Sequence, residues 1–183
     1  MPCPECPQEQ NFNVITGFIT PGSDFPGPHP LDASISVDVF DPNENNERIR
    51  VVEISDPFDV VVDWAICGPL AAAMCGCWEV KVYIDDIDGV APSSGLLGET
   101  TVDLSTESSG GGSEPGVKRC YTYPFHFPAG TVGVDPASKT GVYSLVVVIT
   151  LRQGGCDANP PGSRLGDFLG FAQIPVLAFF NDV

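Results

Sequence analysis

Apolar and polar residues alternate along much of this chain with a period of two. In residues 58–67, Phe58, Val60 and Val62 alternate with positions that include Asp59 and Asp63. Successive side chains of a β-strand point to opposite faces of the sheet, so this alternation indicates a strand with one buried face and one solvated face. The same period recurs in residues 33–39, 78–85, 121–127 and 143–151.

Weaker apolar runs indicate further strands, and turn residues separate them. We expect these strands at residues 12–20, 48–54, 96–105 and 168–180. Only residues 70–74 are helix-like, and they are too few for more than a turn or two. About nine strands without helices between them predict an all-β, antiparallel two-sheet β-sandwich.

The length of 183 residues fits one domain. We expect a tail rich in proline and cysteine at residues 1–11, followed by a single β-sandwich domain at 12–183. Residues 105–116 are rich in serine and glycine and predict a flexible loop within that domain.

Two motifs near the end of the chain resemble a known class of domain. The sequences Phe-Pro-Ala-Gly-Thr-Val (127–132) and Gly-Val-Tyr-Ser-Leu-Val-Val (141–147) are similar to the end of bacterial immunoglobulin-like or fibronectin-III-like domains. The resemblance implies that the Gly-x-Tyr-x-Leu segment opens the penultimate strand and that Tyr143 forms a tyrosine corner. Leu145 stands where an antibody domain has its second cysteine. The resemblance implies an immunoglobulin-like fold and no activity.

The formal net charge of -16 excludes several classes of partner. Such a chain is repelled by nucleic-acid phosphates and by anionic membranes, so we expect no nucleic-acid binding. No run of about 18 apolar residues exists, so we expect no membrane insertion. The N-terminal residues do not resemble a secretory signal. An extracellular or cell-surface location is nevertheless our expectation.

The chain contains an odd number of cysteines. Disulfide bonds are the favoured interpretation, and one thiol would then remain for an intermolecular bond or for burial. Two alternatives stay open, namely buried free thiols and a zinc site built from the two close cysteine pairs. The disulfide candidates are Cys3, Cys6, Cys67, Cys75, Cys77, Cys120 and Cys156.

One acidic turn offers ligands for a metal ion. Asp85, Asp86 and Asp88 precede Gly89, and carboxylate oxygens are the ligands that Ca²⁺ prefers. An ordinary solvated turn explains the same residues, because aspartate favours such positions. Calcium is therefore the one cofactor that we consider, and otherwise we expect none.

No residue pattern indicates catalysis. The only two histidines are His29 and His126, and the sequence pairs neither with a nucleophile. We therefore predict that the chain is not an enzyme.

The closing segment is more apolar than one buried face requires. A surplus apolar face or edge is typical of a strand that packs on a neighbouring subunit. The predicted assembly surface consists of Phe171, Ile174, Val176, Leu177, Phe179 and Phe180.

Two functions from different classes follow from these features. The first is a non-catalytic structural subunit that assembles with itself into a filament, sheath, appendage or coat. The second is a carbohydrate- or protein-binding β-sandwich module, with calcium as a candidate cofactor.

Overall fold

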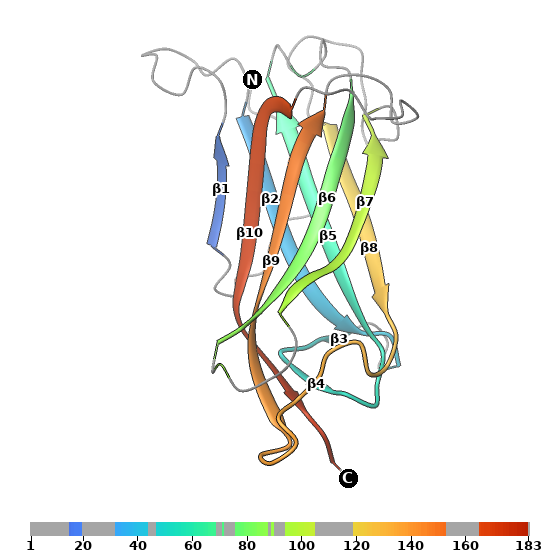
Figure 1. Cartoon of the computed structure of the whole chain (residues 1–183). Coiled ribbons are helices and arrows are strands. Elements are labelled where there is room, and N and C mark those ends of the chain that lie inside the picture. The colour runs from blue at the N-terminus through green and yellow to red at the C-terminus, as the bar shows by residue number, and fades with distance from the viewer. Residues whose placement is uncertain are drawn as a thin grey trace.

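The protein folds into two β-sheets that pack face to face (Figure 1). The structure is a computed structural model that describes residues 15–19, 32–43, 47–68, 71, 76–87, 89, 94–104, 119–152 and 165–182. Ten strands lie within these residues, which confirms the predicted all-β two-sheet sandwich. The predicted tail at 1–11 and the predicted loop at 105–116 lie outside the described residues.

Each sheet combines strands that are consecutive in the sequence with strands from distant parts of the chain. We call the first sheet A; its strands run in the order β1-β10-β9-β6-β7, with β4 beside β10. Its members are β1 (Ile15–Ile19), β4 (Val51–Glu53), β6 (Cys77–Asp86), β7 (Gly95–Asp103), β9 (Thr140–Arg152) and β10 (Leu165–Phe180). Sheet B has the order β3-β2-β5-β8. Its members are β2 (Asp32–Asp41), β3 (Glu47–Arg48), β5 (Phe58–Cys67) and β8 (Arg119–Phe127).

The strand predicted at residues 48–54 is two strands that belong to different sheets. Arg48 of β3 pairs with Phe40 of β2, whereas Val51 of β4 pairs in parallel with Ala178 of β10. The chain therefore crosses from sheet B to sheet A at Ile49 and Arg50. Both halves alternate in the sequence, so the period alone does not reveal the crossover.

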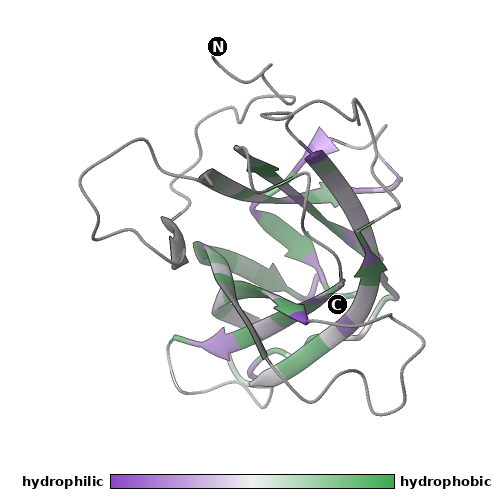
Figure 2. Ribbon diagram, turned by 90° about the horizontal axis from the view of Figure 1, so that it is seen from above, coloured by the Kyte–Doolittle hydropathy of each residue, from purple (hydrophilic) through white to green (hydrophobic). Residues whose placement is uncertain are grey.

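The apolar positions of the alternating strands meet between the two sheets. Trp64 stacks on Tyr121 with ring centroids 5.3 Å apart, and Trp78 reaches both rings from sheet A at 6.2 Å. Phe58 lies 5.1 Å from Phe127 toward the other end of the core. Seen from above, the hydrophobic positions recur along the strands of both layers (Figure 2). The predicted one-faced burial of these strands is confirmed.

Tyr143 anchors the start of β9, as the resemblance implied. Its hydroxyl donates a hydrogen bond to the backbone carbonyl of Gly133, ten residues upstream. A Cβ atom at Gly141 would lie 2.7 Å from the Tyr143 ring. The glycine of the Gly-x-Tyr motif is therefore required because the tyrosine ring lies against it.

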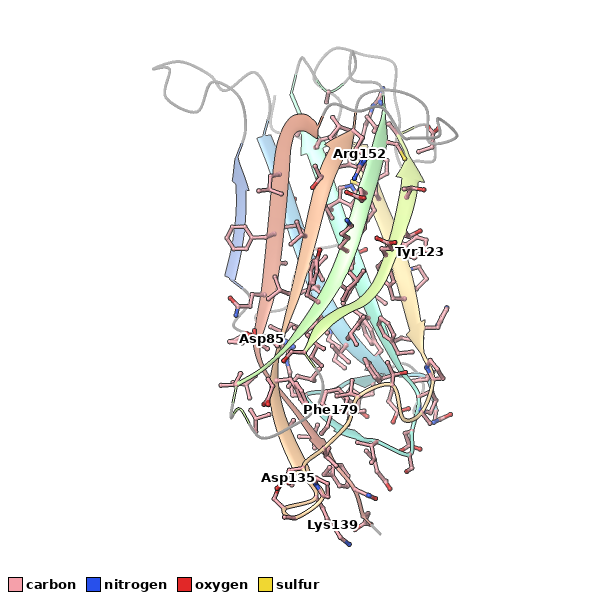
Figure 3. The ribbon with its side chains drawn as sticks, in the orientation of Figure 1. Asp85, Tyr123, Asp135, Lys139, Arg152 and Phe179 are labelled. Carbon is pink, nitrogen blue, oxygen red and sulfur yellow. The ribbon has the colours of Figure 1, made fainter. Side chains whose placement is uncertain are left out.

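The loop between β8 and β9 is held by its own hydrogen bonds. The Asp135 carboxylate accepts the backbone N–H groups of Ala137 at 3.2 Å and Ser138 at 2.9 Å. The side-chain and backbone hydrogen bonds from Ser138 hold the pKa of Asp135 below its ordinary value. Lys139 adopts a φ of 57°, which closes the turn. Figure 3 shows Asp135 and Lys139 together at the lower tip of the molecule.

A β-bulge interrupts the alternation of β10. Ile174 pairs with Leu145 and Leu177 pairs with Tyr143, so β10 has one extra residue in this interval. Pro175 lies in the bulge, where its missing N–H breaks no regular ladder bond. The Ser144 hydroxyl donates to the Ile174 carbonyl at 3.4 Å and accepts the Gln173 amide at 2.6 Å. The break in the sequence pattern therefore marks a bulge.

The predicted helical turn at residues 70–74 is described only at Ala71, which forms part of a 3₁₀ turn. No helix among the described residues is long and apolar enough to cross a membrane.

Candidate functional site

The outer faces of the two sheets differ in polarity. Within the part of the chain that the structure describes, every large apolar side chain that is strongly exposed belongs to sheet A or directly follows β6. None belongs to sheet B. These exposed residues are Val51, Ile87, Leu96, Leu169, Phe171 and Val176. Because monomeric proteins rarely expose contiguous apolar patches, the outer face of sheet A is the candidate functional site.

The strand register arranges these side chains in rows. Directly paired residues of neighbouring strands share a face of the sheet. One row crosses three strands through Phe171, Val148 and Lys81. The next row crosses four strands through Gln173, Val146, Tyr83 and Leu96. We call the following residues the sheet A face: Tyr83, Leu96, Val146, Val148, Leu169, Phe171 and Val176.

A cluster of paired charges lies beside the upper part of the sheet A face. Arg152 donates from Nη2 to both carboxylate oxygens of Glu79 at 2.7 Å. Lys81 Nζ lies 3.3 Å from Glu79 and 3.8 Å from Glu99. Figure 3 shows Arg152 near the upper end of β9 and Asp85 in the lower half of the sheet. The four clustered side chains carry no net formal charge.

The charge cluster lowers the pKa of Glu79. Partial burial raises this pKa, but hydrogen bonds and charges from Arg152 and Lys81 outweigh burial and hold it below its ordinary value. Ionised Glu79 therefore stabilises the fold at pH values above its unfolded-state pKa. This contribution is lost as the pH falls through the lowered folded-state pKa.

We expect Glu79→Gln to lower the free energy of unfolding at neutral pH by up to about 1 kcal/mol, because the partly exposed ion pairs are screened by solvent. The difference from the wild type should shrink as the pH falls below about 4. Urea denaturation at several pH values measures both effects. Glu99→Gln is the control, since Glu99 is more exposed and farther from Lys81, and it should change the pH profile little. A Glu79→Gln difference that grows toward acid would contradict the assignment.

The predicted assembly surface includes residues that do not lie at the surface. Phe171 and Val176 are exposed, and Phe180 is half-buried. Ile174, Leu177 and Phe179 are each at most 1% exposed and lie in the core, so their assignment to a surface is wrong. The bulge is the physical reason, because its extra residue turns Ile174, Leu177 and Phe179 all toward sheet B.

The outer face of sheet B is mainly polar, and several of its acidic groups have hydrogen-bonding or ion-pair partners. Asp63 accepts the Thr122 hydroxyl at 2.5 Å, and His126 Nδ1 lies 2.8 Å from Asp59.

A third acidic residue on this face is Asp38, which forms an ion pair with Arg48 at 3.0 Å. Burial raises the pKa of Asp38, against the opposing charges of Arg48 and Arg50. These polar groups already bind one another, so the outer face of sheet B has fewer groups available to bind a partner than the sheet A face has.

The predicted calcium ligands stay a prediction. Asp85 is exposed at the end of β6, and the Asp86 backbone N–H donates to the Ser94 hydroxyl at 3.1 Å. Asp88 lies outside the described residues. No group of three or more His, Cys, Asp or Glu side chains that could hold a metal ion occurs in the described part of the chain.

Three of the seven cysteines lie in the described residues. Cys67 ends β5, Cys77 begins β6 and Cys120 lies near the start of β8, and each is disulfide-bonded. The other candidates, Cys3, Cys6, Cys75 and Cys156, lie outside the described residues. The pairing of the seven cysteines stays a prediction.

Comparison with known proteins gives distant structural likenesses only. No family model matches the chain. No curated protein sequence matches it either. The C-terminal domain of Wzt has a TM-score of 0.44 at 12% identity, with 82% of this chain and 74% of that chain covered.

Two further likenesses are of the same kind. A CARDB domain from Pyrococcus furiosus, solved with di-metal ions, has a TM-score of 0.36 at 14% identity, with 78% of this chain and 92% of that chain covered. A β-glucosidase from Listeria innocua has a TM-score of 0.39 at 12% identity, with 64% of this chain and 14% of that enzyme covered. These likenesses assign no function to this chain.

Sequence reasoning found part of the sheet A face and missed part. Val146 and Val148 are recognisable in the sequence as surplus apolar residues on β9, and the structure leaves both half-buried on the outer face. Leu96 and Tyr83 gave no such signal, because Leu96 lies in a weak apolar run and Tyr83 occupies a single position on the polar side of an alternating strand. Only the register, which pairs Tyr83 with both Val146 and Leu96, places them in one patch.

Proposed function

We propose that this protein is a non-catalytic β-sandwich module that docks a protein partner through the sheet A face. The observation that carries the proposal is the contrast between the two outer faces. Sheet A exposes Leu96, Leu169, Phe171 and Val176, whereas no large apolar side chain of sheet B is strongly exposed among the described residues. Removing such apolar area from water is favourable at roughly 25 cal/mol per Å².

The composition of the sheet A face indicates the kind of partner. Several side chains of the face are aliphatic and form no hydrogen bonds, so only contact with another apolar surface stabilises them by removing them from water. They are Val146, Val148 and Leu169. The adjoining cluster of Glu79, Lys81, Glu99 and Arg152 supplies the polar border that surrounds the apolar centre of a typical protein interface. A protein surface satisfies both requirements.

Site-specific photocrosslinking in the producing cells tests this proposal. A benzophenone amino acid at position 171 should give a discrete adduct, because Phe171 lies on the proposed docking surface. The matched control is the same amino acid at position 34, since Ser34 is exposed on the outer face of sheet B. Mass spectrometry of the adduct identifies the attached protein.

The comparison of the two positions decides the outcome. A protein adduct at position 171 that is absent or much weaker at position 34 supports docking through the sheet A face. Equal labelling at both positions, or an adduct at position 34 alone, overturns the proposal.

The other functional predictions are kept as proposals. They are the assignment to the immunoglobulin-like class, carbohydrate as the ligand, calcium at Asp85, Asp86 and Asp88, and the extracellular or cell-surface location.

A further inference from the structure

We infer that the partner which docks on the sheet A face is a second copy of this chain, packed face to face about a twofold axis that crosses the strands. The axis would follow the row Gln173–Val146–Tyr83–Leu96. This inference rests on the proposed function and adds the identity and the orientation of the partner.

Charge complementarity across the row supports this arrangement. Lys81 and Asp85 lie on the same face of β6, two residues before and two residues after Tyr83. The twofold axis lies in the plane of the interface and runs perpendicular to the strands. A residue on one side of the row in one copy therefore faces a residue from the other side of the row in the second copy. Lys81 of each copy then faces Asp85 of the other, and the two opposite-charge contacts form symmetrically.

The apolar residues obey the same symmetry. Phe171 lies on one side of the row, and Val176 lies in the bulge on the other side. The axis therefore brings Phe171 of each copy toward Val176 of the other. Val146 meets its own counterpart on the axis. Two sheets packed in this way keep aligned strands and interdigitating apolar side chains, as in a β-sandwich core.

The net charge of the chain does not oppose this contact. The formal charges of the cluster beside the apolar residues sum to zero, whereas the whole chain carries a formal net charge of -16. The cluster consists of Glu79, Lys81, Glu99 and Arg152. Charges elsewhere on the two copies are screened beyond a Debye length of about 8 Å at physiological ionic strength. The charge cluster beside the apolar residues of the sheet A face therefore adds no net repulsion between two copies.

Analytical ultracentrifugation of the full, oxidised chain tests the inference. The wild type should reach the mass of two chains as its concentration rises. Val146→Glu should remove the dimer, because two glutamates would meet on the axis. Ser34→Glu is the control for added charge on the opposite face and should leave the dimer unchanged.

A charge-reversal cycle tests the orientation. Lys81→Glu and Asp85→Lys should each raise the dimer dissociation constant at least about tenfold, because like charges then face each other. The double variant should return to within about threefold of the wild type, because opposite charges again face each other across the interface. Circular dichroism and thermal melting of each monomer check that the variants are folded.

The outcomes separate this inference from the proposed function. A wild-type chain that stays monomeric at every concentration overturns the inference, and a photocrosslink from position 171 to a different protein would still support the docking surface. A dimer that Val146→Glu and the charge reversals leave intact overturns both the inference and the use of this face. A dimer whose double variant shows no recovery overturns the proposed orientation.

Discussion

Phe179→Ala is expected to lower the free energy of unfolding by about 3–5 kcal/mol, the range for loss of a buried phenylalanine. Phe179 is 1% exposed, and its ring lies 5.5 Å from both Phe58 and Tyr143 in edge-to-face contact. Truncation removes these contacts and leaves a cavity that neighbouring strands of two sheets cannot close. The loss is a large fraction of the stability of a typical domain.

Phe171→Ala is the matched control, because Phe171 lies on the same strand but is 38% exposed on the outer face. Its truncation should cost less than about 1 kcal/mol in the monomer. Urea denaturation followed by tryptophan fluorescence measures both, since Trp64 and Trp78 are buried in the core. Should Phe179→Ala not fold, Phe179→Leu preserves the comparison at a smaller cost. Equal effects at positions 171 and 179 would contradict the structure of β10.

Gly141→Ala is expected to lower the free energy of unfolding by about 1–3 kcal/mol, the usual cost of overpacking. The added Cβ would lie 2.7 Å from the Tyr143 ring, a distance that real Cβ atoms do not tolerate. The ring cannot move away freely, because its hydroxyl donates a hydrogen bond to the Gly133 carbonyl and the ring makes an edge-to-face contact with Phe179. Thermal and urea denaturation measure the effect.

A double-mutant cycle isolates the contact between Gly141 and Tyr143. In a Tyr143→Leu background the ring is absent, so Gly141→Ala should cost much less than it does in the wild type. Tyr143→Phe keeps the ring and loses only the hydroxyl, so it should cost about 1 kcal/mol through the lost hydrogen bond. If Gly141→Ala costs the same in both backgrounds, the glycine is needed for a reason other than the tyrosine ring.

Prediction from the sequence was most successful for strands that bury one face. The run from Phe58 to Cys67 was predicted with the bounds that β5 has in the structure. The resemblance of the Gly-x-Tyr-x-Leu segment to immunoglobulin-like domains also implied the tyrosine anchor that Tyr143 forms. In both cases the signal is local, because it lies in a short run of consecutive residues.

Prediction was less successful where a residue's environment depends on distant strands. The crossover at Ile49 and Arg50 depends on which sheet has an edge strand free to pair with each end of the segment. No local sequence pattern indicates which sheet that is. The assembly surface predicted on the closing strand included Ile174 and Phe179, because a wholly apolar run does not show which side faces the core. The bulge at Pro175 decides it, and a bulge is defined by the partner strand.

The sequence by itself determined the class of fold, the position of most strands and the side of each regular strand that is buried, because a period of two follows from the geometry of a single strand. The tertiary structure alone decided which outer face is apolar. Four different strands supply Leu96, Tyr83, Val146 and Phe171, and only the hydrogen-bonded register brings these residues into adjacent rows. A surface patch is a property of neighbours in space, so it was not visible until the strands were paired.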